Sequence, residues 1–260
     1  MIIFAFMTRY FLELAYKGTR YRGFQVQLNA ATVQLEVEKA LETFFRQRIV
    51  LTGSSRTDAG VHALQNYFHF DFDGEVAAVS LYNLNAILPA DIVLRSVRAV
   101  EREGEQAHAR FHAVSREYKY YIYNTKNPFL DDRAYYYPYA LDMPLLEQAA
   151  AVIMRHTDFT SFSKRNTQVR TFRCQVMVSE WERAEDCLVY RVKANRFLRG
   201  MVRGLVGTML QVGRGKIGLN ELNDIIEKKD CTLADFSVPA QGLFLVAVEY
   251  PESFFVRRET

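Results

Sequence analysis

The spacing of apolar residues predicts strands and helices in alternation over the first hundred positions. Apolar residues recur from Val33 to Phe45 with the 3.6-residue period of a helix, and Thr32 is a favoured capping residue in front of them. Leu64, Phe68, Phe70 and Phe72 are expected on one face of a strand. The predicted strands are Arg9–Tyr16, Ile49–Thr52, Leu64–Phe72 and Ile92–Val100, with a second helix near Leu81–Ile87.

The second part of the chain repeats this order loosely. Asp142, followed by Pro144, has the residue types that begin a helix, and Asn220 is the expected cap of the last helix. Gly213 is placed to end a helix whose apolar positions run from Val202 to Leu210. The predicted strands are Arg116–Tyr123, a less regular one at Arg133–Tyr139, a hairpin of Phe172–Trp181 with Leu188–Ala194, and Leu243–Tyr250; the helices are 142–155, Leu198–Gln211 and the one capped by Asn220.

These patterns predict an α+β fold built from two β-α-β-β-α-β halves. Such halves are ferredoxin-like, an order that RNA-recognition folds share, and they form antiparallel sheets with helices on one face. We place the halves at residues 1–110 and 111–260. No linker rich in proline or glycine separates them, so we expect one body with a cleft between the halves.

Composition is that of a folded globular protein. Of 260 residues, 49% are apolar and 24% are charged. No apolar run reaches the ~18–20 residues of a membrane helix. The apolar segment Met1–Met7 is short and follows no basic region, so the sequence predicts no secretory signal. Met1 and Met7 are both candidate start residues.

The sequence predicts neither a metal site nor a nucleotide cofactor. Its three cysteines, Cys174, Cys187 and Cys231, are scattered and form no C-x-x-C pair, which is typical of a cytoplasmic protein with reduced thiols. The five histidines have no H-E-x-x-H spacing, and no G-x-G-x-x-G or Walker sequence is present.

Charge is nearly balanced overall but unevenly distributed. The net charge is +3, yet two stretches carry basic residues and no acid. Such stretches indicate a polyanion-binding surface, or simply solvated faces of the fold. The basic residues are Lys164, Arg165, Arg170 and Arg173 in the first stretch, and Arg191, Lys193, Arg196, Arg199, Arg203, Arg214 and Lys216 in the second.

Three features could carry chemistry. Arg56 and Asp58 lie in a glycine-bounded loop, where the alternative is an ordinary turn with the aspartate bonded to the backbone near Gly60. Tyr118 lies on a tyrosine-rich strand and could stack on a base, although cross-strand core packing also explains such tyrosines. Arg199 and Arg203, four apart, are expected on one helix face. These features include one carboxylate and no clear second one, so they do not form the carboxylate pair of a glycosidase. A carboxylate with a tyrosine and several arginines suits chemistry on an RNA base.

The sequence resembles the tRNA pseudouridine synthase A family over nearly its whole length. The most specific match is the loop R-T-D-A-G-V-H at residues 56–62. Phe24 stands where the family often has tryptophan, and Ser55 where it usually has glycine. The other matching segments are Ala15–Gln25, Thr32–Gln34, Ala109–Phe111 with Tyr118–Tyr120, Phe159–Phe162, Phe197–Arg203 and Gly242–Leu245.

This resemblance implies an isomerase that converts uridine to pseudouridine without a cofactor or a metal. Asp58 corresponds to the catalytic aspartate, as a nucleophile or as a base, and Arg203 to its partner. Tyr118 corresponds to the tyrosine that stacks on the target base and handles the proton at C5. Arg56 is expected to wedge into the stem as the uridine leaves it. Lys164, Arg165 and Arg199 are expected to contact RNA.

The resemblance also implies the partners. The substrate would be the anticodon stem-loop of tRNA, at uridines 38, 39 and 40, and family members are homodimers in which each tRNA spans both subunits. Two other functions remain open from the residues alone. One is a catalytically silent RNA-binding module, and the other is a nucleoside hydrolase or glycosylase that releases a free base.

Overall fold

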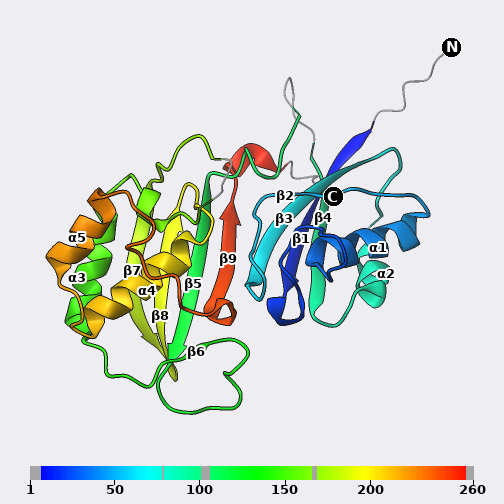
Figure 1. The fold of residues 1–260 in the computed structure, drawn as a ribbon. Coiled ribbons are helices and arrows are strands. Elements are labelled where there is room, and N and C mark those ends of the chain that lie inside the picture. The colour runs from blue at the N-terminus through cyan, green and yellow to red at the C-terminus, as the bar shows by residue number, and fades with distance from the viewer. Residues whose placement is uncertain (1–6, 78, 101–105, 166–168, 256–260) are drawn as a thin grey trace. The chain divides into compact units, whose positions relative to one another are not determined.

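The structure, a computed structural model, describes residues 7–77, 79–100, 106–165 and 169–255 (Figure 1). The segment before Met7, on which the choice of start residue depends, lies outside these ranges. The chain divides into two compact units, residues 1–114 with 245–260, and residues 115–244. The sequence-based division assigned everything after residue 110 to the second half, whereas the spatial grouping assigns the last sixteen residues, 245–260, to the first unit.

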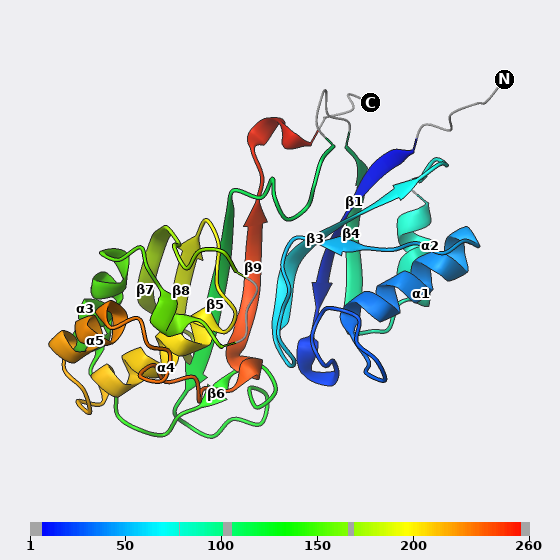
Figure 2. The ribbon, with the colours of Figure 1, turned by 45° about the horizontal axis from the view of Figure 1, so that its top comes forward.

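The first unit is an antiparallel sheet with two helices on the same side of its strands (Figures 1 and 2). Strand β1 is central and pairs on one edge with β3 and on the other with β4, while the short β2 pairs with β3. The elements are β1 (Thr8–Tyr16), α1 (Val33–Phe45), β2 (Thr52–Gly53), β3 (His62–Phe72), α2 (Ser80–Ile87) and β4 (Ile92–Ala99), with 3-10 turns at Gly18–Arg20 and Glu252–Phe254.

Strand β3 is covered on both faces, whereas the sequence analysis identified apolar residues on one face only. Leu64, predicted on the same face as Phe68 and Phe70, is 43% exposed, whereas Tyr67 on the opposite face is 6% exposed. The cause is the C-terminal segment, whose aromatic rings cover that face. The Tyr250 ring meets the Tyr67 ring edge-on at 5.3 Å, and the Phe254 ring meets that of Phe11 at 5.2 Å.

The second unit contains three antiparallel strands in the order β5-β8-β7 and three helices. Helix α3 packs against β7 and against the other two helices. The elements are β5 (Ser115–Tyr123), β6 (Tyr135–Tyr136), α3 (Met143–Met154), β7 (Val176–Ala184), β8 (Cys187–Ala194), α4 (Met201–Gly213), α5 (Leu219–Glu227) and β9 (Leu243–Glu249), with 3-10 turns at Thr160–Phe162 and Ala240–Gly242. Strand β9 begins in this unit and ends in the first.

Several predicted boundaries of helices and strands differ from those in the structure, while two predicted helix caps are confirmed. Thr32 and Asp142 do cap their helices, accepting from Leu35 N at 3.4 Å and Leu145 N at 3.0 Å. Asn220 lies inside α5, and the cap position is Gly218. Of the strands predicted at 133–139 and 49–52, only Tyr135–Tyr136 and Thr52–Gly53 form.

Helix α4 begins later than predicted because Gly200 adopts a left-handed conformation, with φ of 76°. Arg199 therefore precedes the helix, and the prediction that Arg199 and Arg203 share a helical face was wrong. The helix also has little solvent-facing surface, since it is buried on most sides from Gly204 to Leu210.

The α+β prediction is confirmed, because the structure is a mostly antiparallel sheet arrangement flanked by five helices within the described residues. No helix in the described part of the chain is both long and apolar enough to cross a membrane.

Candidate active site

The loop that carries Asp58 connects β2 to β3 and is held by backbone hydrogen bonds on both sides. Ser54 N donates to Tyr67 O at 2.8 Å, and Phe24 N donates to Thr57 O at 3.0 Å. After the aspartate, Val61 N donates to Asp58 O at 3.1 Å. The backbone on either side of Asp58 is therefore fixed to neighbouring segments.

The Asp58 side chain is half-buried, and its carboxylate is unengaged within the first unit. The alternative from the sequence was a turn in which this carboxylate bonds to the backbone near Gly60. Among the described residues of the unit, however, no donor bonds to it, and the turn is closed by the Asp58 carbonyl instead. The carboxylate oxygens thus keep their capacity to react or to bind a substrate.

The segment of residues 18–23 lies directly against this loop, and two glycines permit the approach. A Cβ atom at Gly18 would lie 2.0 Å from Val61 O, and one at Gly23 would lie 3.0 Å from Thr57 O. Gly23 also has a φ of 101°, which other residues rarely adopt. This contact explains why the segment Ala15–Gln25 and the aspartate loop, which are far apart in sequence, form one local structure.

A buried network of polar side chains on β1 and β3 is hydrogen-bonded to the loop. The sequence analysis did not predict this network. Asn66 on β3 is fully buried. Its Nδ2 donates to Tyr16 Oη at 3.2 Å and to Ser55 O at 3.1 Å, while its Oδ1 accepts from Ser54 Oγ at 2.9 Å. The Tyr16 hydroxyl lies 2.8 Å from Thr57 Oγ1. The available signal was a lone asparagine within the apolar strand that follows the loop.

Cations near the loop differ in how they are held. Arg20 pairs with Asp91 at 2.7 Å, and Tyr21 also donates to Asp91, at 2.6 Å. Burial, followed by the contact with Asp91, raises the pKa of Tyr21 to about 12. Arg56 is exposed and has no ion-pair partner among the described residues of its unit. Its guanidinium is therefore available to an external anion.

Tyr118 is a buried residue of β5 in the second unit. It is 8% exposed, and its ring meets the Phe197 ring edge-on at 4.9 Å. Its neighbour Tyr120 is fully buried and donates to Pro239 O at 2.7 Å. The core-packing explanation therefore holds for Tyr120, while the Tyr118 ring, from the interior of β5, contacts Phe197 of the segment that leads into α4.

Arg203 is anchored to backbone carbonyls in the same unit. Its Nε donates to Val238 O at 2.8 Å, and its Nη2 donates to Phe236 O at 3.4 Å. The residue is half-buried. These bonds fix the orientation of the guanidinium, so this arginine differs from a mobile surface cation.

Lys164 and Arg199 are brought together from separate motifs. Lys164 N donates to Arg199 O at 3.0 Å, and the aliphatic stem of the lysine lies over Gly200. Arg165, next to Lys164, is exposed, and its charge helps to lower the pKa of Asp230, for which hydrogen bonds from Thr232 are the main cause.

The sequence suggested that the two basic stretches bind a polyanion, but some of their residues already have partners within the protein. Arg191 pairs with Glu117 at 2.7 Å and with Glu180 at 2.8 Å, and these bonds raise its pKa further. Arg214 lies 3.8 Å from the centre of the Tyr139 ring. The partners come from other strands and loops, which local charge counting does not detect.

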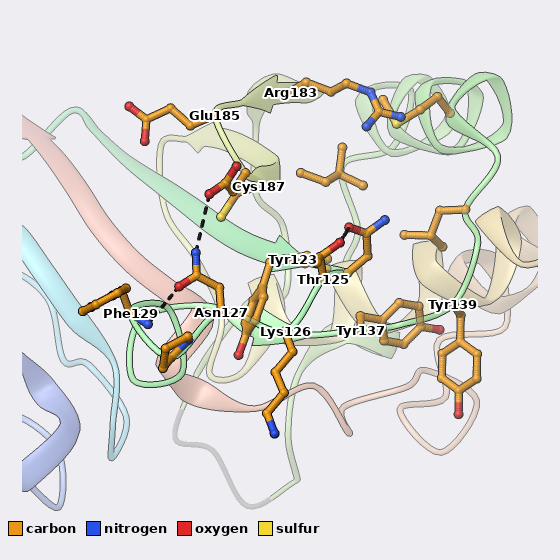
Figure 3. A pocket seen from close by; sticks show the side chains of 17 residues that line it. Tyr123, Thr125, Lys126, Asn127, Phe129, Tyr137, Tyr139, Arg183, Glu185 and Cys187 are labelled. Atoms are coloured by element: carbon orange, nitrogen blue, oxygen red, sulfur yellow. Dashed lines mark hydrogen bonds between the residues drawn. The ribbon is translucent and has the colours of Figure 1, made fainter.

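A pocket of about 650 Å³ lies elsewhere in the second unit, and none of the predicted site residues lines it (Figure 3). Asn127 donates to Asp186 Oδ2 at 3.5 Å across one side of it. Phe129 at its rim is 79% exposed. Its charged lining residues are of both signs, namely Lys126, Arg183, Glu185 and Asp186. No cluster of three or more potential metal ligands occurs within the described ranges.

Comparison with known proteins gives a consistent match. The family described as tRNA pseudouridine synthase matches residues 155–251. A Bacteroides fragilis protein named tRNA pseudouridine synthase A is 45% identical over 95% of this chain and 98% of its own length. Proteins of the same name from Parabacteroides distasonis and Bacillus subtilis are 43% and 38% identical, over 96% and 91% of this chain and 98% and 97% of their own lengths. With this identity over nearly its full length, the chain belongs to the tRNA pseudouridine synthase A family.

Proposed function

We propose that this protein, an isomerase that converts uridine in tRNA to pseudouridine, acts on the anticodon stem-loop at positions 38, 39 and 40. Membership of the family supports the conversion of uridine to pseudouridine as the reaction. The observation that supports the site is the Asp58 carboxylate, which a fixed loop presents without a hydrogen-bonding partner in its own unit. The motif resemblance over nearly the whole chain supports the choice of positions.

The reaction requires one carboxylate and no external energy. The N1–C1′ bond of uridine breaks, the base rotates, and C5 bonds to C1′; C5 then loses its proton and N1 gains one. Asp58 either attacks the sugar as a nucleophile or removes a sugar proton as a base. Both routes need an ionised carboxylate held close to the ribose.

The other site residues have complementary roles in this proposal. Tyr118 stacks on the detached base, since its buried ring offers a π face next to Phe197. Its hydroxyl relays the C5 proton. Arg203, which backbone carbonyls orient, keeps the Asp58 carboxylate ionised. Arg56 enters the stem when the uridine is extruded.

RNA binding is assigned to the exposed and half-buried cations near the start of α4. Lys164 and Arg199 are joined by a backbone bond, and Arg165 follows directly. We assign phosphate contacts to all three, with recognition by shape. Such binding takes place in the cytoplasm in this proposal.

We also propose that the protein is a homodimer. The support is the pocket region of the second unit, where the exposed Phe129 and the half-exposed Tyr139 lie among lysine, arginine and acidic side chains. A two-fold interface must be self-complementary, and a patch that carries both charge signs meets that condition. The acids Glu185 and Asp186 make the same patch unfavourable for a polyanion.

Product analysis distinguishes this function from the two alternatives. Unmodified tRNA is incubated with the protein, its mass is measured, and pseudouridines are mapped by carbodiimide labelling and primer extension. We expect unchanged mass and pseudouridine at positions 38, 39 or 40. Release of free uracil would identify a hydrolase instead. Bound but chemically unchanged tRNA would identify a binding module, and pseudouridine elsewhere would refute the proposed positions.

A further inference from the structure

A chain of hydrogen bonds runs from the centre of β3 to the residue that precedes Asp58. Asn66 Nδ2 donates to Tyr16 Oη at 3.2 Å, and Tyr16 Oη lies 2.8 Å from Thr57 Oγ1. Tyr16 is the last residue of β1, so two strands of the first unit, β3 and β1, hold this chain before it reaches Thr57 in the loop. It connects that sheet to the aspartate loop through side chains alone.

Thr57 is fixed at two separate points by this arrangement. Its hydroxyl contacts Tyr16, and its carbonyl accepts a hydrogen bond from Phe24 N at 3.0 Å. Asp58 shares a peptide bond with Thr57, and its carboxylate has no hydrogen bond of its own within the described part of the unit. The position of the carboxylate therefore depends on the backbone that Thr57 fixes.

The Tyr16 hydroxyl is suited to hydrogen bonding and not to proton transfer. The residue is 5% exposed, and burial raises its pKa to about 12 even though the bonds to Thr57 and Asn66 act in the opposite direction. It therefore remains protonated at neutral pH. With Asn66 donating to its oxygen, the tyrosine keeps a proton that it can share with Thr57.

We infer that Tyr16 is a positioning residue for the isomerisation, acting on Asp58 through the hydroxyl–hydroxyl contact with Thr57. This inference rests on the proposed function, because it takes Asp58 as the catalytic carboxylate. Rate depends steeply on geometry, and a misplacement of about 1 Å can cost on the order of 10²-fold in rate. Tyr16 itself touches neither the substrate nor the reacting atoms in this account.

The test is Tyr16→Phe, which removes one buried oxygen and keeps the ring. The matched control is Tyr190→Phe, because the Tyr190 hydroxyl is also buried and lies 2.8 Å from the Ser179 hydroxyl, in the second unit. With saturating tRNA, we expect Tyr16→Phe to lower the single-turnover rate by about 10- to 100-fold. The dissociation constant for tRNA should not change. Tyr190→Phe should lower the melting temperature similarly and keep the parent rate.

Removing the same contact from its other end provides a second measurement. Thr57→Val deletes the hydroxyl at nearly constant shape, and Thr57→Ser restores it. We expect the first variant to lose rate and the second to keep most of it. The double variant Tyr16→Phe with Thr57→Val should lose no more than either single variant, since both remove one interaction. If Tyr16→Phe does not fold, the comparison of the rates of Thr57→Val and Thr57→Ser tests the inference by itself.

Parent-like rates in Tyr16→Phe or in Thr57→Val, or fully additive losses in the double variant, would overturn the inference. So would an equal rate loss in Tyr190→Phe. The variant Asp58→Asn separates the two levels of the proposal. If Asp58→Asn is inactive while Tyr16→Phe keeps the parent rate, only the positioning role fails. If Asp58→Asn is active, the assignment of Asp58 as the catalytic carboxylate fails, and if the parent forms no pseudouridine in tRNA, the proposed function itself fails.

Discussion

The backbone amide of Lys164 donates a hydrogen bond of 3.0 Å to the carbonyl oxygen of Arg199. This bond joins the segment that follows the 3-10 turn Thr160–Phe162 to the residues in front of α4. Gly200 permits the contact, because a Cβ atom there would lie 3.0 Å from Lys164 Cγ. Two cations from separate motifs are thereby placed side by side on one surface of the second unit.

Arg199→Ala should therefore weaken tRNA binding and reduce its dependence on salt. Each lost phosphate contact lowers the slope of log affinity against log salt by about 0.7–0.9. Arg155→Ala is the matched control, because this exposed arginine at the end of α3 lies outside both basic stretches. Binding isotherms over a salt series measure the slopes. Equal slopes for the parent and Arg199→Ala would remove Arg199 from the RNA interface.

Arg203→Ala should give the opposite pattern. Its guanidinium is held by the carbonyls of Val238 and Phe236, and its proposed role is to keep Asp58 ionised. We expect a lower single-turnover rate at saturating tRNA and an unchanged salt slope. A reduced slope with the parent rate would instead make Arg203 a phosphate contact.

Tyr118→Phe separates stacking from proton transfer. The phenylalanine keeps the ring that contacts Phe197, so binding of tRNA should not change. If the hydroxyl relays the C5 proton, the single-turnover rate falls by roughly 10²-fold or more. We expect this loss, and a parent-like rate would leave stacking as the only role of Tyr118.

The stability of the first unit should decrease as the pH falls from about 6.5 to about 4. Burial, together with the charges of Arg9 and His108, lowers the pKa of His69 from 6.5 to about 4. In this window the unfolded chain binds a proton that the folded chain does not, so stability present above pH 6.5 is lost as the pH falls. Protonation would also oppose the hydrogen bond that Ala109 N donates to His69 Nδ1 at 3.2 Å.

The measurement is urea unfolding at a series of pH values for the parent and for His69→Asn. Asparagine offers an oxygen near the position of Nδ1 and does not titrate. We expect the pH dependence between about 4 and 6.5 to be smaller in the variant. The same pH dependence in both proteins would show that His69 does not cause it.

Phe129→Glu should weaken the proposed homodimer. Phe129 is 79% exposed at the pocket rim, and in the proposed interface a carboxylate in its place would have to lose its hydration, which costs free energy that the apolar ring does not. Tyr82→Glu on α2 is the control, because Tyr82 is an aromatic residue with 77% exposure in the first unit. Light scattering after size exclusion gives the masses. A monomeric parent, or a dimer that Phe129→Glu leaves intact, would refute this interface.

The sequence predicts elements well where local chemistry determines them. The caps at Thr32 and Asp142 and the central strands follow from periodicity and capping preferences. Features that depend on distant residues were not predictable in this way. The start of α4 follows Arg199 and Gly200, which are held by contact with Lys164, and the second buried face of β3 depends on the C-terminal aromatic residues.

The candidate site shows the same limit. The loop of Arg56 and Asp58 is visible in the sequence because its motif is continuous. The support by Tyr16 and Asn66 is not, because those residues lie on different strands and meet only in the folded sheet. Likewise, the ion pair that occupies Arg191 involves Glu117 on a neighbouring strand.

The account depends most directly on Asp58, and the decisive measurement is the single-turnover rate of pseudouridine formation by Asp58→Asn. The change is isosteric, and the loop backbone is held by bonds that do not involve the carboxylate. Folding and tRNA affinity should therefore match those of the parent and of the exposed control Asp73→Asn. The rate should fall by several orders of magnitude, about 4–7 kcal/mol of barrier. Pseudouridine formation by Asp58→Asn at more than a few per cent of the parent rate would contradict the assignment of Asp58 as the catalytic carboxylate.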